Sequence, residues 1–258
     1  MSRGWILDLD MGNTRIKWRL RTAGKLGSSG AMLYDSELHA SESVSILNAM
    51  PEAEGLSRIR IASVAGSERN QMLRRWCLQS WQLEPEFARV SAVCAGVSNG
   101  YRDFRKIGVD RWLGVLAAYH HCRRSCLVVD CGSAVTVDMV TGSGEHLGGY
   151  IVPGLHLMRQ ALFRETDAVK VAAAQVLELQ MPGRDTGEAV NKGQMLMVLG
   201  LISESRRQLA QLVGETVGDE LPLVILTGGD APEVGHHLRG ACEHLPHLVL
   251  DGLALAIP

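Results

Sequence analysis

The order of hydrophobic and polar positions along the chain predicts alternating strands and helices. Short apolar or alternating runs predict strands at residues 6–10, 16–20, 58–62, 86–90, 127–130, 134–140, 146–152, 221–226 and 248–250. Apolar residues three or four positions apart predict helices at residues 67–83, 107–122, 155–163 and 187–213, and a last apolar helix closes the chain. We expect turns in the Gly- and Ser-rich segment 24–30 and at 98–101, and a polar amphipathic stretch at 38–50.

Each half of the chain begins with strands in hairpin succession and continues with strands that alternate with helices. This repeated order indicates an α/β protein with a duplicated ribonuclease-H-like fold, the architecture of the actin-like ATPases. We expect two tandem halves, residues 1–107 and 108–258, with a nucleotide cleft between them. The inter-half helix, residues 108–122, belongs to the second half in this division.

Length and charge narrow the functional classes. A chain of 258 residues is long enough for one large domain or two packed halves. The net charge of −2 argues against sequence-independent binding of nucleic acid, which needs a strongly basic face. No run approaches the roughly 18 apolar residues of a membrane span, and the charged N-terminus argues against a signal peptide. We therefore expect a cytoplasmic protein with no nucleic-acid or membrane partner.

The six cysteines are scattered, and no pair has the Cys-x-x-Cys spacing of a zinc site. Most of them lie in apolar segments. This placement favours buried free thiols in a reducing compartment.

Two segments with a shared spacing carry the candidate chemistry. In the first, an apolar strand runs into Asp10, turns at Gly12 and continues through a strand that contains Lys17. In the second, 120 residues later, Asp130 and Gly132 repeat the carboxylate and the glycine. A glycine lets the backbone approach a phosphate, a lysine supplies positive charge, and an aspartate can hold hydrated magnesium. Either segment alone is equally well explained as a structural turn, but the repeat favours a paired site for a nucleotide triphosphate.

Three further clusters add to this picture. Residues 108–111 place a carboxylate and a guanidinium at a helix N-terminus, where anions bind, although Asp110 could act only as a helix cap. The glycines between Gly148 and Gly154 indicate either close backbone approach or a strained edge or turn. Thr227-Gly228-Gly229 follows a buried strand and is a candidate shelf for adenosine.

Together these motifs resemble, in composition and order, those of type III pantothenate kinases. The members of this family are bacterial enzymes of the actin-like superfamily that phosphorylate pantothenate in coenzyme A synthesis. The resemblance extends from the N-terminal strand to the C-terminal Gly-Gly pair, and the ordered set is far more specific than any one motif. The motifs that carry it are DMGNTRIK at 10–17, GVDR at 108–111, DCGSA at 130–134, TVD at 136–138, GGYIVPG at 148–154 and DTG at 185–187.

The resemblance implies a role for each matching residue. Asp110 resembles the catalytic base, and Asp130 resembles the ligand of a monovalent cation, K⁺ or NH₄⁺. The residues implied in binding ATP, which carries Mg²⁺, are Asp10, Met11, Gly12, Asn13, Thr14, Arg15, Ile16, Lys17 and Ser133. The residues implied in binding pantothenate are Tyr101, Gly108, Val109, Asp110, Arg111 and Thr186. Family members are homodimers, and the partner subunit helps to close the pantothenate pocket.

Some points differ from the family pattern or stay open. Ser133 stands where the family more often has threonine, and it keeps the hydroxyl group. Arg111 is suited either to the carboxylate of pantothenate or to the phosphoryl group in transfer. Val137 is taken as the counterpart of Lys17, so a monovalent cation at Asp130 would supply the charge that a basic residue does not.

Two other functions compete with pantothenate phosphorylation. One is another kinase or a phosphohydrolase of the same superfamily, such as a sugar kinase; residues 108–111 and the short chain argue against it. The other is a non-catalytic nucleotide-binding regulatory or accessory protein, which could dispense with Asp110. If Asp110 is not the base, Asp138 is the next candidate.

Overall fold

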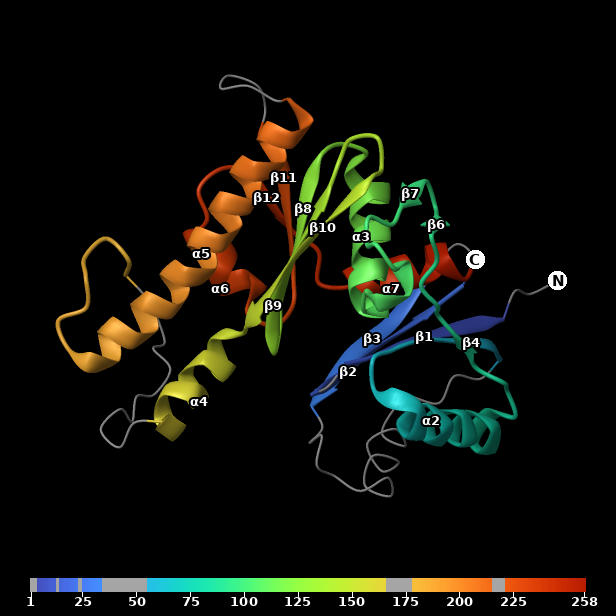
Figure 1. Cartoon of the computed structure of the whole chain (residues 1–258). Helices are drawn as coiled ribbons and strands as arrows, with labels where there is room; N and C mark the ends of the chain where they lie inside the picture. Colours follow the sequence, from blue (N-terminus) through green and yellow to red (C-terminus); the bar gives the residue numbers. More distant parts are fainter. Residues whose placement is uncertain (1–3, 13, 23–24, 34–54, 166–177, 215–220) are drawn as a thin grey trace. The chain divides into compact units, whose positions relative to one another are not determined.

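A computed structural model of the chain describes residues 4–12, 14–22, 25–33, 55–165, 178–214 and 221–258 (Figure 1). The amphipathic stretch expected at 38–50 lies outside the described residues. The chain divides into two compact units, each made of segments that are discontinuous in sequence. The first unit comprises Met1–Gly96, Arg102–Ala117 and His247–Pro258, and the second comprises Val97–Tyr101 and Ala118–Pro246.

The first unit is built on a five-stranded sheet with the strand order β3-β2-β1-β4-β5. β1 pairs with β2, and β2 with β3, in antiparallel fashion, whereas β4 lies parallel to β1 and β5 parallel to β4. The strands are β1 (Trp5–Met11), β2 (Arg15–Arg21), β3 (Leu26–Leu33), β4 (Leu56–Ser63) and β5 (Glu86–Phe87). The other elements are α2 (Gly66–Trp81), β6 (Val93–Cys94), η1 (Phe104–Lys106) and α7 (Leu248–Ala256).

The second unit repeats this topology in a sheet with the order β10-β9-β8-β11-β12. Its pairings again run antiparallel, antiparallel, parallel and parallel. Its strands are β8 (Cys126–Cys131), β9 (Ala134–Val140), β10 (His146–Pro153), β11 (Leu223–Thr227) and β12 (Cys242–His244), and β7 (Val97–Ser98) precedes them. Its helices are α4 (Leu155–Glu165), α5 (Thr186–Val213) and α6 (Ala231–His237), and α3 (Val109–Cys122) crosses the division between the units. The repeated topology confirms the predicted duplicated α/β fold.

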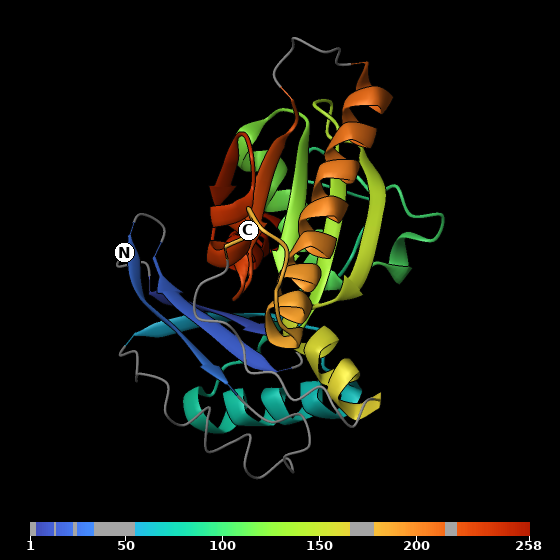
Figure 2. The same ribbon diagram turned by 90° about the vertical axis from the view of Figure 1, so that its left-hand side faces the viewer.

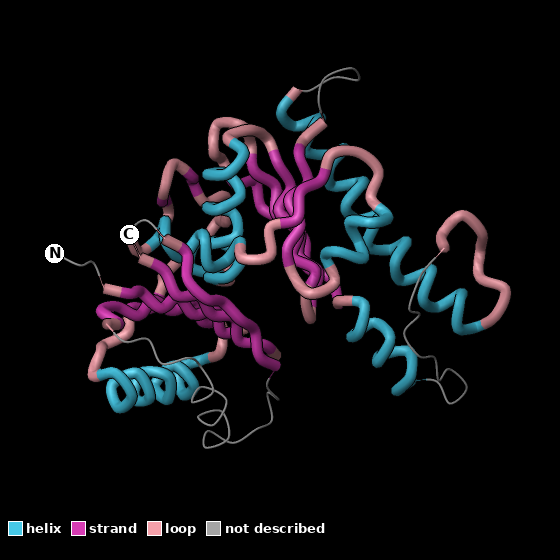
Figure 3. Tube along the Cα trace, turned by 180° about the vertical axis from the view of Figure 1, so that it is seen from behind, coloured by secondary structure: helices cyan, strands magenta, loops and turns pink. Residues whose placement is uncertain are grey.

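Alternating side chains give the first sheet one apolar and one charged face. Leu7, Leu9 and Met11 of β1 pack in one core with Leu73 and Trp76 of α2. α2 lies along this face of the sheet (Figures 1 and 3). Because successive strand residues point to opposite faces, the residues between them point away from α2.

In the second unit, α5 supplies one side of the core. Met195, Val198, Ile202 and Leu209 are buried along this helix, as expected from its periodicity, and pack on the sheet. α5 runs along the face of β8 and β9 (Figure 2).

Two predicted elements were wrong. The described part of the segment at 24–30 belongs mainly to strand β3, where Gly27 and Gly30 leave room for the rings of Trp5 and Trp18. Residues 248–250 begin helix α7 and do not form a strand. Three apolar residues are too few for periodicity to separate the two structures, and α7 buries them against the first unit.

The cysteines that were expected to be free are all unpaired thiols. Burial raises the pKa of Cys77 and of Cys131 to about 12. Cys122, at the end of α3, differs because a hydrogen bond with the Cys126 thiol lowers its pKa to about 6.

No helix in the described part of the chain is both long and apolar enough to cross a membrane.

Helices α3 and α7 cross closely within the first unit. A Cβ atom added at Gly252 would lie 2.0 Å from the backbone oxygen of Leu113. Helix propensity alone would make Gly252→Ala stabilising by about 1 kcal/mol. We expect the opposite sign, a fall of about 1–3 kcal/mol in the free energy of unfolding, because the methyl group would force the helices apart. Urea denaturation measures it, and a stabilised Gly252→Ala protein would contradict this packing.

The thiol pKa values predict selective alkylation of the native protein. A thiolate is the reactive form, so the rate at Cys122 should rise as the pH increases through about 6 and level off above it. Cys77 and Cys131 should stay unmodified over the same range. Iodoacetamide labelling read by peptide mass spectrometry tests this. A rate at Cys122 that keeps rising through pH 9, as for an ordinary thiol, would contradict it.

Candidate functional site

The turn between β1 and β2 carries the first set of predicted phosphate-binding residues. The Gly12 amide donates a hydrogen bond to the Arg15 carbonyl at 3.1 Å, which closes the turn. Asp10 and Lys17 face each other across the antiparallel pair, so their side chains share one face of the sheet. Both are half-buried. The turn therefore presents a carboxylate and an ammonium group side by side.

The remaining residues of this turn differ in what they can offer a ligand. Met11 and Ile16 are buried in the core beneath α2, so only their backbone groups could meet a phosphate. Thr14 is exposed at the tip of the turn. Asn13 lies outside the described residues.

A buried carboxylate lies on the same face of β1 as Asp10, two residues earlier. Asp8 has no exposed surface. It lies 2.7 Å from a guanidinium nitrogen of Arg60 in β4 and 3.6 Å from one of Arg19 in β2. Burial raises the pKa of Asp8, and the charges of Arg60 and Arg19 oppose that rise. Arg19 also contacts Asp251 of α7 at 2.6 Å, so the cluster connects three strands and a helix.

The turn between β8 and β9 carries the second set. The Gly132 amide donates to the Ala134 carbonyl at 3.0 Å. Ser133 is exposed at the tip, and half-buried Asp130 faces Thr136 across the antiparallel pair. The predicted equivalence of the two turns therefore extends from sequence spacing to strand pairing.

One detail of that equivalence was wrong. The second turn is one residue shorter, because the last facing pair is 11 and 16 in the first hairpin but 131 and 135 in the second. The counterpart of Lys17 is therefore Thr136, while Val137 is fully buried. Threonine is neutral, so the second turn still lacks a basic residue at this position.

Two glycine motifs lie directly against the second turn. The Gly154 amide donates to the Ser133 carbonyl at 2.9 Å, and a Cβ at Gly154 would lie 2.2 Å from the Gly132 oxygen. Gly228 has a φ of +95°, and it too leaves no room for a side chain. A Cβ added there would lie 2.5 Å from Asp130 Oδ1. Close backbone approach therefore explains both glycines, and both shape the surroundings of the turn.

The start of α3 carries the residues implied in catalysis. The Trp112 amide donates to the Gly108 carbonyl at 3.0 Å, and Asp110 is the second helical residue. One oxygen of its carboxylate accepts a hydrogen bond from the Arg111 amide at 2.8 Å. Asp110 thus satisfies a free amide of the first turn, although it is not the N-cap residue. It is half-buried, and Arg111 is buried.

Tyr101 and Asp138 both lie in the second unit. Tyr101 is half-buried and stacks on the ring of His146. The Asp138 side chain is 2% exposed and its carboxylate lies 2.8 Å from Nε2 of the same histidine. A general base must reach the substrate proton directly or through one water. The burial and the partner of Asp138 therefore argue against it as a substitute for Asp110.

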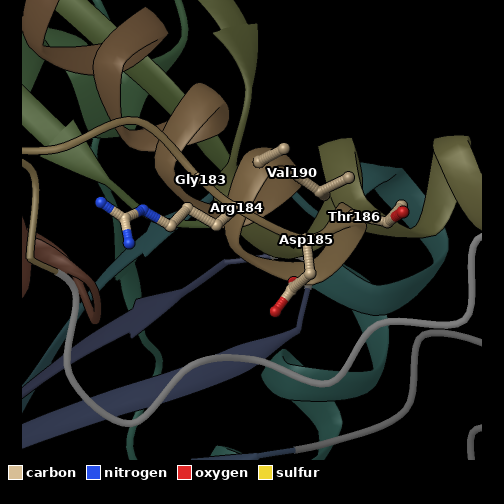
Figure 4. A pocket seen from close by; sticks show the side chains of 6 residues that line it. Gly183, Arg184, Asp185, Thr186 and Val190 are labelled. Atoms are coloured by element: carbon tan, nitrogen blue, oxygen red, sulfur yellow. The ribbon is translucent and has the colours of Figure 1, made fainter.

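Thr186 lies at the first turn of α5, on the rim of a pocket of about 530 Å³ (Figure 4). The pocket is lined by Gly183, Arg184, Asp185, Thr186, Ala189 and Val190. Asp185 is the N-cap of α5 and accepts a hydrogen bond from the Glu188 amide at 2.8 Å. Arg184 and Thr186 project in opposite directions from the helix start (Figure 4). The pocket offers a cation, a hydroxyl group and the free amides of a helix N-terminus.

The predicted residues therefore fall into local groups within each unit. The first unit holds the β1–β2 turn and the start of α3, with Asp110 and Arg111. The second unit holds Asp130 and Ser133 in one turn, together with Tyr101 and Thr186. Among the described residues, no group of three or more His, Cys, Asp or Glu side chains could hold a metal ion. Magnesium that arrives on a nucleotide needs only one or two protein carboxylates, so Asp10 remains a candidate ligand.

Sequence reasoning missed two buried polar groups near these sites. One is the cluster of Asp8 with its arginines, and the other is the His146–Asp138 pair. The available signal was an ionisable residue inside an apolar strand, as in the run Ile6-Leu7-Asp8-Leu9. Such a residue is rarely buried without a partner.

The repeated sheets and their paired turns define a protein of the actin-like ATPase fold class. A Baf-family protein from Campylobacter jejuni has a similar structure, with a TM-score of 0.58 and 18% identity over 97% of this chain and 96% of that one. This likeness concerns the fold alone.

Sequence comparison gives the family. The family model of type III pantothenate kinases matches residues 6–208. Type III pantothenate kinases of Pseudomonas putida (strain W619) and Ectopseudomonas mendocina (strain ymp) are 39% and 40% identical to this chain, over 98% of it and 99% of each relative. The chain belongs to the type III pantothenate kinase family.

Proposed function

We propose that this protein transfers the γ-phosphoryl group of ATP to the primary hydroxyl of pantothenate, forming 4′-phosphopantothenate and ADP in the first step of coenzyme A biosynthesis. The proposal rests on the family to which the chain belongs and on the residues that it keeps. The chain has both predicted phosphate-binding turns, β1–β2 and β8–β9, and it has Asp110 and Arg111 at the start of α3. Phosphoryl transfer needs positioning and charge neutralisation more than covalent chemistry, and these groups supply both.

The two turns divide the binding of the triphosphate. The first turn would contribute backbone amides, the Thr14 hydroxyl and the Lys17 ammonium group, and Asp10 would hold the hydrated Mg²⁺ that ATP carries. The second turn contributes the Ser133 hydroxyl and its amides. Thr227-Gly228-Gly229, which lies against this turn, supports the adenosine.

A monovalent cation fits the second turn on chemical grounds. The half-buried carboxylate of Asp130 is a hard oxygen ligand, and the turn has neutral Thr136 where the first turn has Lys17. K⁺ or NH₄⁺ at Asp130 would supply positive charge to the triphosphate.

Asp110 is the general base. Its carboxylate orients the primary hydroxyl of pantothenate and accepts its proton as the oxygen attacks the γ-phosphorus. The other residues proposed to contact pantothenate are Gly108 and Val109 of the first unit and Tyr101 and Thr186 of the second. Arg111 is held nearly buried beside Asp110, where it can bind either the pantothenate carboxylate or the phosphoryl group in transfer.

The protein is further proposed to act as a homodimer. α3 buries its apolar residues within the chain, but α5 leaves Leu196 and Met197 54% and 65% exposed. Gly193 and Gly200 lie one turn away on either side, with open space where a Cβ would be. These four residues share one helix face, and an apolar face with small flanking residues suits close approach of a second copy around a twofold axis.

The activity is tested by ADP release from purified protein with MgATP. We expect release to depend on pantothenate and to increase when K⁺ or NH₄⁺ is added to a buffer that lacks both. Turnover that is equal with pantothenate omitted would indicate a phosphohydrolase and would contradict the proposal.

The role of Asp110 is tested by Asp110→Asn, which keeps the shape of the side chain but cannot take a proton. We expect kcat to fall by roughly 10²–10⁴, about 3–5 kcal/mol of barrier, with little change in ATP binding or Tm. Asn can still cap a helix, so a purely structural role predicts a rate near wild type. Asp103→Asn, at the half-buried N-cap of η1, is the matched control and should keep full activity.

The dimer is tested by light scattering at micromolar concentration. Wild-type protein should show about twice the chain mass of 28.0 kDa. Met197→Glu should shift it toward the monomer, because the interface would bury an unpaired charge. Val93→Glu, at a first-unit residue that is equally exposed (67%), should leave the dimer intact. A fully active monomer in the wild type would refute the proposed assembly.

A further inference from the structure

Residues 97–101 belong to the second unit although the chain on both sides of them belongs to the first. Backbone contacts hold this short segment against the β9–β10 hairpin. The Ser98 amide donates to the Gly144 carbonyl at 2.9 Å, and Ser98 forms an isolated bridge with Glu145. The Tyr101 amide donates to the side-chain oxygen of Asn99 at 3.0 Å. The segment therefore reaches Tyr101 in a defined conformation.

At its end the segment lies on His146 of β10. A Cβ at Gly100 would lie 1.8 Å from the His146 backbone oxygen, so any side chain there would lift the segment off the strand. The rings of Tyr101 and His146 stack, with centroids 5.9 Å apart and planes inclined by 15°. This separation lies within the range of attractive ring pairs.

The His146 ring is held by a buried contact with Asp138. Its side chain has no exposed surface, and its Nε2 lies 2.8 Å from Oδ1 of Asp138, whose side chain is 2% exposed. In the tautomer that carries its proton on Nε2, the ring donates this hydrogen bond to the Asp138 carboxylate, which only accepts. Among the described residues, Nδ1 of this ring is buried and has no hydrogen-bond partner. One strong hydrogen bond at one ring edge thus sets the plane on which Tyr101 rests.

We propose that His146, anchored by Asp138, is a positioning residue that fixes the Tyr101 ring for binding pantothenate. This inference rests on the proposed function, in which Tyr101 contacts that substrate. Tyr101 is half-buried at the end of a five-residue segment. Without the stack, binding would have to order its side chain, and ordering costs affinity.

The stacking of Tyr101 on His146 predicts that one kinetic constant, the KM for pantothenate, should respond to mutation of His146. His146→Leu removes the ring and should raise the KM for pantothenate about three- to ten-fold, with kcat and the KM for ATP changed less than two-fold. Asp138→Asn keeps an oxygen that can accept from Nε2–H, so its effect should be smaller than that of Asp138→Leu. A residue needed only for folding would lower Tm and the active fraction without this selective change in one KM.

A double-mutant cycle isolates the route of the effect. If His146 acts through Tyr101, His146→Leu should have almost no further effect on the pantothenate KM in a Tyr101→Ala background. Equal effects in both backgrounds would overturn the proposal. Because buried substitutions can prevent folding, Gly100→Ala provides a second approach: it displaces the segment and leaves the buried pair intact, and it should raise the same KM.

Wild-type kinetics distinguish failure of the proposed function from failure of the positioning role of His146. If the wild type shows no pantothenate-dependent ADP release, both the proposed function and this inference fail. If the wild type is active, but folded His146→Leu and Gly100→Ala proteins keep its pantothenate KM, only the inference fails. A selective rise in that KM, absent from the Tyr101→Ala background, is the supporting result.

Discussion

The first unit depends on a carboxylate that has no access to water. Asp8 lies between Arg60 and Arg19 on the face of the sheet opposite α2. The same two arginines reach the C-terminal segment, Arg19 through Asp251 and Arg60 through the backbone oxygen of Ile257 at 2.7 Å. Removing one partner from such a cluster leaves a buried charge uncompensated, which typically costs about 3–5 kcal/mol. The cluster therefore holds β1, β2, β4 and the end of the chain together.

The functional consequence follows from strand geometry. Asp10 lies two residues after Asp8, and Lys17 two residues before Arg19, so the pairing that fixes the cluster also fixes these two side chains on the same face. A slip of one residue would move them to the opposite face. The buried ion pairs thus specify the strand register at the proposed phosphate-binding turn. This role is separate from their net contribution to stability, which is typically small for buried ion pairs.

Duplication gives the second unit the same strand order but different chemistry. Its turn faces Asp130 with neutral Thr136, and its buried histidine–aspartate pair lies farther along the hairpin. The two turns therefore have different parts in the proposed binding of ATP: the first contributes a lysine, and the second relies on a hydroxyl group and a monovalent cation. The shared topology explains why the two turns occupy equivalent positions in their sheets. Their different side chains explain why they are proposed to contribute different groups to ATP binding.

Much of this arrangement could be predicted from the sequence, because strand and helix periods and the spacing of the turns are local signals. The hairpins, α2, α3 and α5 follow from them. The start of α7 could not be predicted, since Leu248-Val249-Leu250 suits either structure until its packing on the sheet is known. The one-residue difference between the turns, which replaces Val137 by Thr136 as the counterpart of Lys17, depends on register. The partners of Asp8 and His146 depend on contacts between residues distant in sequence or on different strands, and no local pattern specifies them.

Transfer of the phosphoryl group from ATP to pantothenate by this protein can be followed with a labelled phosphate. ATP labelled in the γ-phosphoryl group with ³²P is incubated with the protein, Mg²⁺, K⁺ and pantothenate, and the products are separated and identified by mass. We expect the label on the primary hydroxyl of pantothenate, in a one-to-one ratio with ADP. Label recovered as inorganic phosphate, with pantothenate unchanged, would contradict it.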